Sequence, residues 1–164
     1  MWENNPKGRL ISDQEQLLKP GKGQSVLGRA EACVMQSVGD EYPAILLDFG
    51  QEIQGGLQLI TGQSAKTRTA NVRIRFGESV GEAMSDIGGP TGATNDHAMR
   101  DFNLTLPWLG VAEVGNTGFR FVRIDLLDPD TELLLKEVRA ISVYEDIPYV
   151  GSFTCNDERL NQIW

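Results

Sequence analysis

The chain has 164 residues, a net charge of −8 at pH 7 and a pI of about 4.6, and 40% of its residues are hydrophobic. This length and composition predict one globular domain with a sizeable core. The charge argues against nucleic acid and anionic membranes as partners, because their phosphates would repel the chain. No run approaches the ~20 apolar residues that cross a bilayer, and the start lacks the basic and apolar regions of a signal peptide.

Residues 1–25 are expected to form an arm ahead of the main domain. Within it, residues 13–19 fit either a short helix or irregular chain, and Pro20-Gly21 ends that segment. One strand is expected near the N-terminus, inside residues 26–35.

Two alternating runs, 45–49 and 57–61, predict strands with one buried and one solvent-facing side. Gly50, Gly55 and Gly56 lie between these runs. Because glycine permits positive φ, the pattern predicts a hairpin with a longer loop.

Further strands are predicted at 72–76, 102–106, 133–135 and 138–144. About eight short strands, separated by Gly, Pro, Asn and Asp and with no long internal helix, indicate an all-β fold. We expect a jelly-roll-like β-sandwich of two sheets, followed by a short C-terminal helix.

Residues 119–127 give a mixed signal, because apolar side chains fall on both faces of the predicted strand. Either both faces are partly covered, or a β-bulge resets the alternation near Phe121.

The long irregular stretch 77–100 is rich in glycine, and a loop of this length in a compact domain is usually functional or disordered. Acidic residues gather in and beside it: Glu78, Glu82, Asp86, Asp96 and Asp101. They fit the acid and base of a glycosidase, a calcium site or solvated loop charges. Solvated charges are favoured, because no EF-hand-like ligand spacing occurs.

Three residues are candidates for carbohydrate binding: Asp96, His97 and Trp108. Asp96 and His97, the only histidine, belong to the densest polar cluster of the chain. An exposed tryptophan can stack on a sugar ring. The competing interpretation is structural: Asp96 and His97 join the loop to the sheet together with Arg100 and Asp101, and Trp108 packs at an edge.

No catalytic residue and no metal ligand is assigned from the sequence. Cys33 and Cys155 are the two cysteines, and their spacing does not match a zinc site. They are either free thiols or a single bridge, and free thiols are favoured.

The last residues predict a helix with Thr154 or Asn156 as its N-cap. Leu160, Ile163 and Trp164 fall on one apolar face, which has nothing further along the chain to pack on. We therefore divide the chain into a β-sandwich, 1–150, and a linker with the start of a helix, 151–164, that leads into a next domain. Phe153 joins the same predicted domain interface.

Five segments together resemble bacterial α-L-rhamnosidases. They are 48–57 (DFGQEIQGGL), 72–78 (VRIRFGE), 94–97 (TNDH), 118–124 (GFRFVRI) and 151–164 (GSFTCNDERLNQIW). The resemblance covers residues 45–164 in the order of the family.

The resemblance implies a β-sandwich that precedes an (α/α)6 catalytic barrel, which hydrolyses terminal α-L-rhamnosides with inversion. The catalytic residues of the family lie in that barrel and have no matching positions here. A periplasmic or secreted parent protein is compatible with the resemblance.

Two functions are carried forward from the sequence. The first is a non-catalytic accessory sandwich that orients the catalytic domain of the same chain. The second is an independent carbohydrate-binding module, without a required cofactor or assisted by calcium. A third class is a structural or protein-interaction sandwich from an unrelated protein. It is less favoured, because the five similar segments occur in the order of the family.

Overall fold

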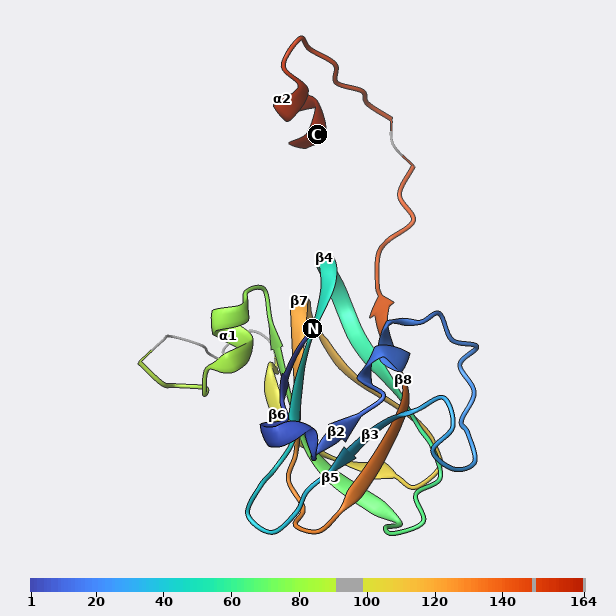
Figure 1. Cartoon of the computed structure of the whole chain (residues 1–164). Coiled ribbons are helices and arrows are strands. Elements are labelled where there is room, and N and C mark those ends of the chain that lie inside the picture. The colour runs from blue at the N-terminus through green and yellow to red at the C-terminus, as the bar shows by residue number, and fades with distance from the viewer. Residues whose placement is uncertain (91–98, 149, 164) are drawn as a thin grey trace.

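The computed structural model describes residues 1–90, 99–148 and 150–163. Within these residues the protein is an all-β sandwich with two short α-helices, the second near the C-terminus (Figure 1). The predicted fold class is therefore confirmed. No helix in the described ranges is long and apolar enough to cross a membrane.

Every strand pairs with its neighbours in antiparallel fashion. The strands are β1 (Trp2–Asn4), β2 (Ile11–Ser12), β3 (Cys33–Gln36), β4 (Ala44–Thr61), β5 (Thr69–Gly77), β6 (Asp101–Pro107), β7 (Gly110–Leu126) and β8 (Glu132–Ser142). The helices are the 3-10 turns Pro6–Gly8 and Gln14–Leu18, α1 (Val80–Met84) and α2 (Glu158–Ile163).

The two longest strands, β4 and β7, pair with each other and take part in both layers of the sandwich. Residues 44–48 of β4 lie between β1 and the second half of β7, and residues 55–61 lie between β8 and the first half of β7. One layer has the order β1-β4-β7-β5-β6 and the other β2-β3-β8-β4-β7. The β4–β7 ribbon folds over the edge of the sandwich from one layer to the other (Figure 1).

The hairpin predicted between residues 45 and 61 is wrong. The two halves of β4 do not pair with each other, because both pair with β7. The glycines instead allow β4 to bend as it changes layer, with φ of 82° at Gly50 and 152° at Gly55. A hairpin and a folded ribbon place the same residue types at the bend, so composition alone does not separate them.

The β-bulge near Phe121, one of the two alternatives for residues 119–127, is present in the structure. The register between β4 and β7 shifts between the pairs Asp48–Phe121 and Ile53–Phe119. Phe119 and Val122 both face the core, although they are three residues apart on one strand. The alternation is therefore reset where the ribbon changes layer.

The structure decides three further expectations. The runs 133–135 and 138–144 form the single strand β8. The segment 13–19 contains a 3-10 helix, so the helical alternative is confirmed. Residues 1–25 are not simply an arm, because β1 pairs with β4 and β2 pairs with β3.

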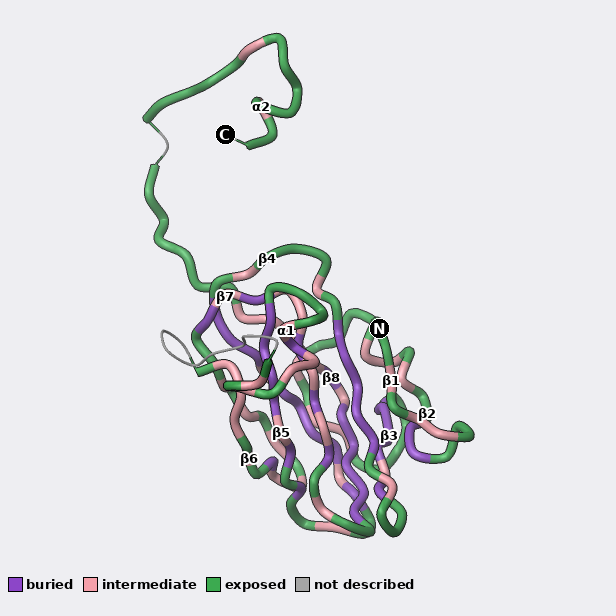
Figure 2. Tube along the Cα trace, turned by 90° about the vertical axis from the view of Figure 1, so that its left-hand side faces the viewer, coloured by how far each residue is buried: buried purple, intermediate pink, exposed green. Residues whose placement is uncertain are grey.

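The larger of two hydrophobic clusters lies between the layers, and Figure 2 shows buried residues along the strands. Phe119 lies at its centre, with edge-on contacts to Phe76 at 4.9 Å and Phe49 at 5.7 Å between ring centroids. Cys33 is fully buried in this core. Both cysteines are free, as favoured by the sequence, and burial raises the pKa of the Cys33 thiol to about 12.

After Ser142 the chain leaves the sandwich and runs out to α2 (Figure 1). The side chain of Asp157 accepts a hydrogen bond from the Arg159 amide at 2.9 Å and so caps this helix. The N-cap predicted at Thr154 or Asn156 is wrong, because the helix begins at Glu158.

Candidate functional site

The outer face of the β1-β4-β7-β5-β6 layer carries an unusual row of side chains. The strand register aligns Trp2, Leu46, Arg123, Arg75 and Asp101 across five neighbouring strands. Their neighbours along each strand face the core, because side chains alternate between the two faces. The row therefore brings a tryptophan and two arginines onto one surface.

Arginines and aspartates on this face form a connected network. Arg73 binds Asp101 with Nε–Oδ1 2.7 Å and Nη2–Oδ2 2.5 Å. Arg75, only 5% exposed, binds Asp125 at 3.0 Å, and Arg123 binds the same carboxylate at 2.6 Å. The carboxylates compensate the arginine charges, so a buried guanidinium is tolerated beneath the surface.

The helix α1 lies across this network and is held by its own capping contacts. Ser79 Oγ accepts a hydrogen bond from the Glu82 amide at 3.2 Å. Arg100 binds Glu82 at 2.5 Å and Glu78 at 3.3 Å. Arg123 Nη1 contacts the Met84 sulfur at 3.3 Å, which joins α1 to β7.

These contacts account for the acidic residues of the stretch 77–100 that the structure describes. Glu78 and Glu82 pair with Arg100, Asp86 pairs with Arg73 and Arg75, and Asp101 pairs with Arg73. Among the described residues, no group of three or more His, Cys, Asp or Glu side chains is placed to hold a metal ion. These ion pairs favour a structural role for the described carboxylates, and a calcium site stays a prediction.

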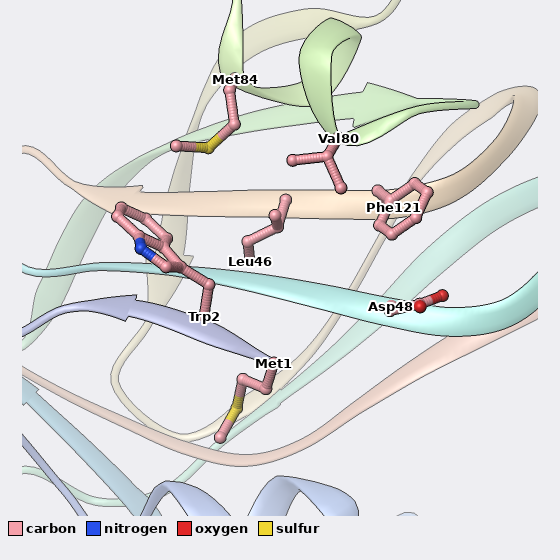
Figure 3. A pocket seen from close by; sticks show the side chains of 7 residues that line it. All are labelled: Met1, Trp2, Leu46, Asp48, Val80, Met84 and Phe121. Atoms are coloured by element: carbon pink, nitrogen blue, oxygen red, sulfur yellow. The ribbon is translucent and has the colours of Figure 1, made fainter.

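A hollow of about 370 Å³ opens between α1 and β1 on the same face (Figure 3). We call it the Trp2 hollow, and it is lined by Met1, Trp2, Leu46, Asp48, Val80, Met84 and Phe121. Leu46 lies between the other side chains, with Trp2 and Phe121 on opposite sides of it. Trp2 is 43% exposed, and the Arg123 guanidinium lies 5.6 Å from its ring centroid.

Asp48 is the acidic group in the lining of the Trp2 hollow. Arg120 holds its carboxylate in a bidentate pair, with distances of 2.8 and 2.9 Å, and the Gly50 amide donates a further hydrogen bond at 2.8 Å. The Arg120 guanidinium, and after it the Gly50 N–H, hold the pKa of Asp48 at about 2, below its ordinary value of 3.8.

This pKa predicts a specific acid response. The folded-state pKa of Asp48 is depressed, so its stabilising contribution is present above pH 3.8 and is lost as the pH falls toward 2. NMR titration of the side-chain carboxyl should give a midpoint near pH 2. In Arg120→Gln the midpoint should move toward 3.8, because the largest cause of the shift is removed.

Arg159→Gln is the matched control, because Arg159 lies on α2 and has no contact with Asp48 among its described hydrogen bonds. It should leave the Asp48 midpoint unchanged. A titration midpoint of the Asp48 carboxyl near pH 4 in the unsubstituted chain would contradict the bidentate pair of Asp48 and Arg120.

Of the three residues expected to bind carbohydrate, the structure describes Trp108 alone. Asp96 and His97 lie outside the described residues. Trp108 directly follows β6. The indole N–H of Trp108 donates to the Ser64 carbonyl at 2.7 Å, and Arg68 lies 4.3 Å over its ring. These contacts favour edge packing, and sugar binding by Trp108 stays a prediction.

The residues predicted to form a domain interface lie on the segment that leaves the sandwich. Ile163 is 80% exposed, and Phe153 and Leu160 are also largely accessible. Trp164 lies outside the described residues. Figure 2 shows the described residues between β8 and α2 as exposed apart from short stretches.

Sequence reasoning missed the Trp2 hollow. One signal for it was present: Phe121 stands on the outward side of β7, where Arg123 and Asp125 also lie. Nothing local points to Trp2, because its position depends on the pairing of β1 with β4.

No protein-family model and no curated protein matches the chain. Among solved structures, it is similar to a rhamnosidase from Klebsiella oxytoca with rhamnose bound, at a TM-score of 0.52 and 19% identity, over 77% of this chain and 25% of that one. It is also similar to a GH78 family rhamnosidase of Bacillus sp. GL1, at a TM-score of 0.58 and 16% identity, over 89% of this chain and 14% of that one.

A second group of similar structures consists of small modules. A fucose binding module of Streptococcus pneumoniae aligns at a TM-score of 0.52 and 12% identity, over 82% of this chain and 88% of the module. The CBM32 of AlyQ, in complex with 4,5-unsaturated mannuronic acid, aligns at a TM-score of 0.51 and 14% identity, over 82% of this chain and 95% of the module. At these identities the likeness concerns the fold, which is a β-sandwich of the same type, and the chain spans a small part of the rhamnosidases.

Proposed function

We propose that the chain is a non-catalytic accessory β-sandwich of an α-L-rhamnosidase. The sandwich ends with β8 at Ser142, and the segment beyond it, up to residue 164, docks on a catalytic (α/α)6 domain of the same polypeptide. The alignment with two rhamnosidases over 77% and 89% of this chain, but only 25% and 14% of theirs, supports a role as one module of a longer enzyme.

The observation that carries this proposal is the apolar surface of the segment beyond β8. Val143, Tyr144, Ile147, Val150 and Ile163 are each more than half exposed. Exposing so many large apolar side chains on one short segment is costly in water, and such surfaces mark interaction sites. A packed catalytic domain would bury them.

Hydrolysis of p-nitrophenyl α-L-rhamnopyranoside by the full open reading frame tests the enzyme assignment. The full protein is expected to be active and the 164-residue chain inactive. A full protein without this activity would refute the rhamnosidase assignment.

Ile163→Asp tests the docking. It should lower the Tm of the full protein and leave the Tm of the isolated chain unchanged, because Ile163 is exposed in the isolated chain. Gln162→Asp introduces the same charge on the neighbouring exposed residue and is the matched control. An equal effect of Ile163→Asp on both proteins would contradict docking.

The second candidate is an independent carbohydrate-binding module. Two observations favour it: the chain aligns with nearly the whole length of two small modules, 88% and 95%, and the Trp2 hollow combines aromatic and charged side chains. Calorimetric titration of the chain with methyl glycosides at roughly millimolar concentration tests it. Absence of heat for every sugar in a broad panel would exclude this function.

A further inference from the structure

We propose that the Trp2 hollow is a binding site for a 6-deoxyhexopyranose, a sugar ring that carries a methyl group where most hexoses carry a hydroxymethyl group. This inference rests on the second candidate function and names its site and its sugar class. Size, stacking surface, hydrogen-bonding capacity and the apolar wall of the hollow each support it.

The hollow has the dimensions of a small-ligand site. Its volume of about 370 Å³ falls in the range of roughly 300–1,000 Å³ that is usual for ligand pockets. It is built largely on rigid elements, because Leu46 and Phe121 belong to the paired strands β4 and β7 and Trp2 to β1. Val80 and Met84 come from α1, which its N-cap and its ion pairs hold in place.

Trp2 supplies a stacking surface for the apolar face of a sugar ring. Its side chain is partly accessible, and Arg123 lies against the ring and limits its movement. Arg123 is fixed in turn by Asp125 at 2.6 Å. An aromatic ring that is pre-positioned in this way binds with little loss of side-chain entropy.

Asp48, held by Arg120, supplies a hydrogen-bond acceptor at one side of the hollow. An ionised carboxylate has about four acceptor positions. Arg120 and the Gly50 amide fill three of them, two on Oδ1 and one on Oδ2. One position on Oδ2 is left for a sugar hydroxyl.

The opposite wall selects against a hydroxymethyl group. Val80, Met84 and Leu46 offer aliphatic carbon and a thioether, which accommodate a methyl group well. A hydroxyl placed there would lose its water without gaining a partner of comparable strength. The geometry therefore favours a sugar with hydroxyls at one edge and a methyl group at the other.

Matched sugars test this preference directly. The two 6-deoxy sugars are methyl α-L-rhamnopyranoside and methyl α-L-fucopyranoside, and their counterparts with a hydroxyl at C6 are methyl α-L-mannopyranoside and methyl α-L-galactopyranoside. At least one 6-deoxy sugar should bind about tenfold more tightly than its counterpart in calorimetry. Equal affinity within both pairs overturns the selectivity.

The location is tested on the same protein by ¹H–¹⁵N NMR of the tryptophan indole N–H groups. The signal of Trp2 should move on titration with the 6-deoxy sugar, whereas that of Trp108, whose N–H is bonded to Ser64, should not. Binding with a shift at Trp108 and none at Trp2 overturns the site and leaves the sugar-binding function standing. Absence of binding by any sugar removes that function too.

Three variants complete the test. Trp2→Ala should weaken binding about tenfold, and Tyr144→Ala, which removes an aromatic ring that is 79% exposed away from the hollow, should not change it. Met84→Gln supplies a partner for a C6 hydroxyl at nearly constant shape, so it should reduce the 6-deoxy preference. Circular dichroism checks that each variant is folded, and an unchanged preference in a folded Met84→Gln protein contradicts the role of the apolar wall.

Discussion

Replacing Gly55 by alanine is expected to lower the free energy of unfolding by about 3–5 kcal/mol, through strain and steric conflict together. Gly55 has a φ of 152°, which L-residues rarely adopt. A Cβ at this position would collide with the Ile141 carbonyl oxygen and lie 3.0 Å from its carbonyl carbon, and both are backbone atoms of β8. Strand β8 would have to move away from β4, at the point where the chain leaves the sandwich.

Urea unfolding followed by tryptophan fluorescence measures this change. Gly50→Ala is the matched control, because Gly50 lies in the same bend with a φ of 82° but has open space around its Cα. We expect Gly50→Ala to cost only about 1 kcal/mol, from the positive φ alone. Equal costs for the two substitutions would show that the close approach of β4 and β8 does not determine the bend.

Replacing Phe119 by alanine is the second large effect that we expect, at about 3–5 kcal/mol. Phe119 is fully buried and contacts Phe76 and Phe49 edge-on. The residues around it belong to both layers of the sandwich, so the surrounding structure cannot collapse easily into the cavity that alanine leaves.

Phe121→Ala is the control, because Phe121 is the same residue type two positions further along β7 but is only half-buried. Its loss should cost less than about 1.5 kcal/mol. Because Phe121 lines the Trp2 hollow, the substitution should also weaken sugar binding, whereas the stability of the core should persist. A larger loss of unfolding free energy in Phe121→Ala than in Phe119→Ala would contradict the position of the β-bulge, because Phe121 would then be the core residue.

The sequence predicts the strands at 72–76 and 102–106 well, because a strand buried on one face alternates apolar and polar side chains. For residues 119–127 the same alternation offers a bulge near Phe121 as one of two alternatives. It misplaces the pairing of residues 45–61, since glycine permits a hairpin and a layer crossing equally and only the partner strand distinguishes them.

For the candidate site, prediction from the sequence was weakest. Asp96, His97 and Trp108 were predicted to bind carbohydrate because polar and aromatic residue types cluster near one another in the chain. The Trp2 hollow joins residues 2, 46–48, 80–84 and 121, which are far apart in sequence. The acidic residues that suggested a metal or a glycosidase pair are largely engaged by arginines of β5 and by Arg100.

By itself, then, the sequence determined the all-β class, the position of several strands and the apolar character of the C-terminal helix, because these depend on neighbours a few residues apart. Only the tertiary structure decided how β4 and β7 fold over the sandwich. It also decided which carboxylates pair with arginines and where the Trp2 hollow forms. The physical reason is register: Trp2, Leu46 and Arg123 become neighbours only when three strands pair in one alignment. A shift of one residue would turn each of these side chains to the other face.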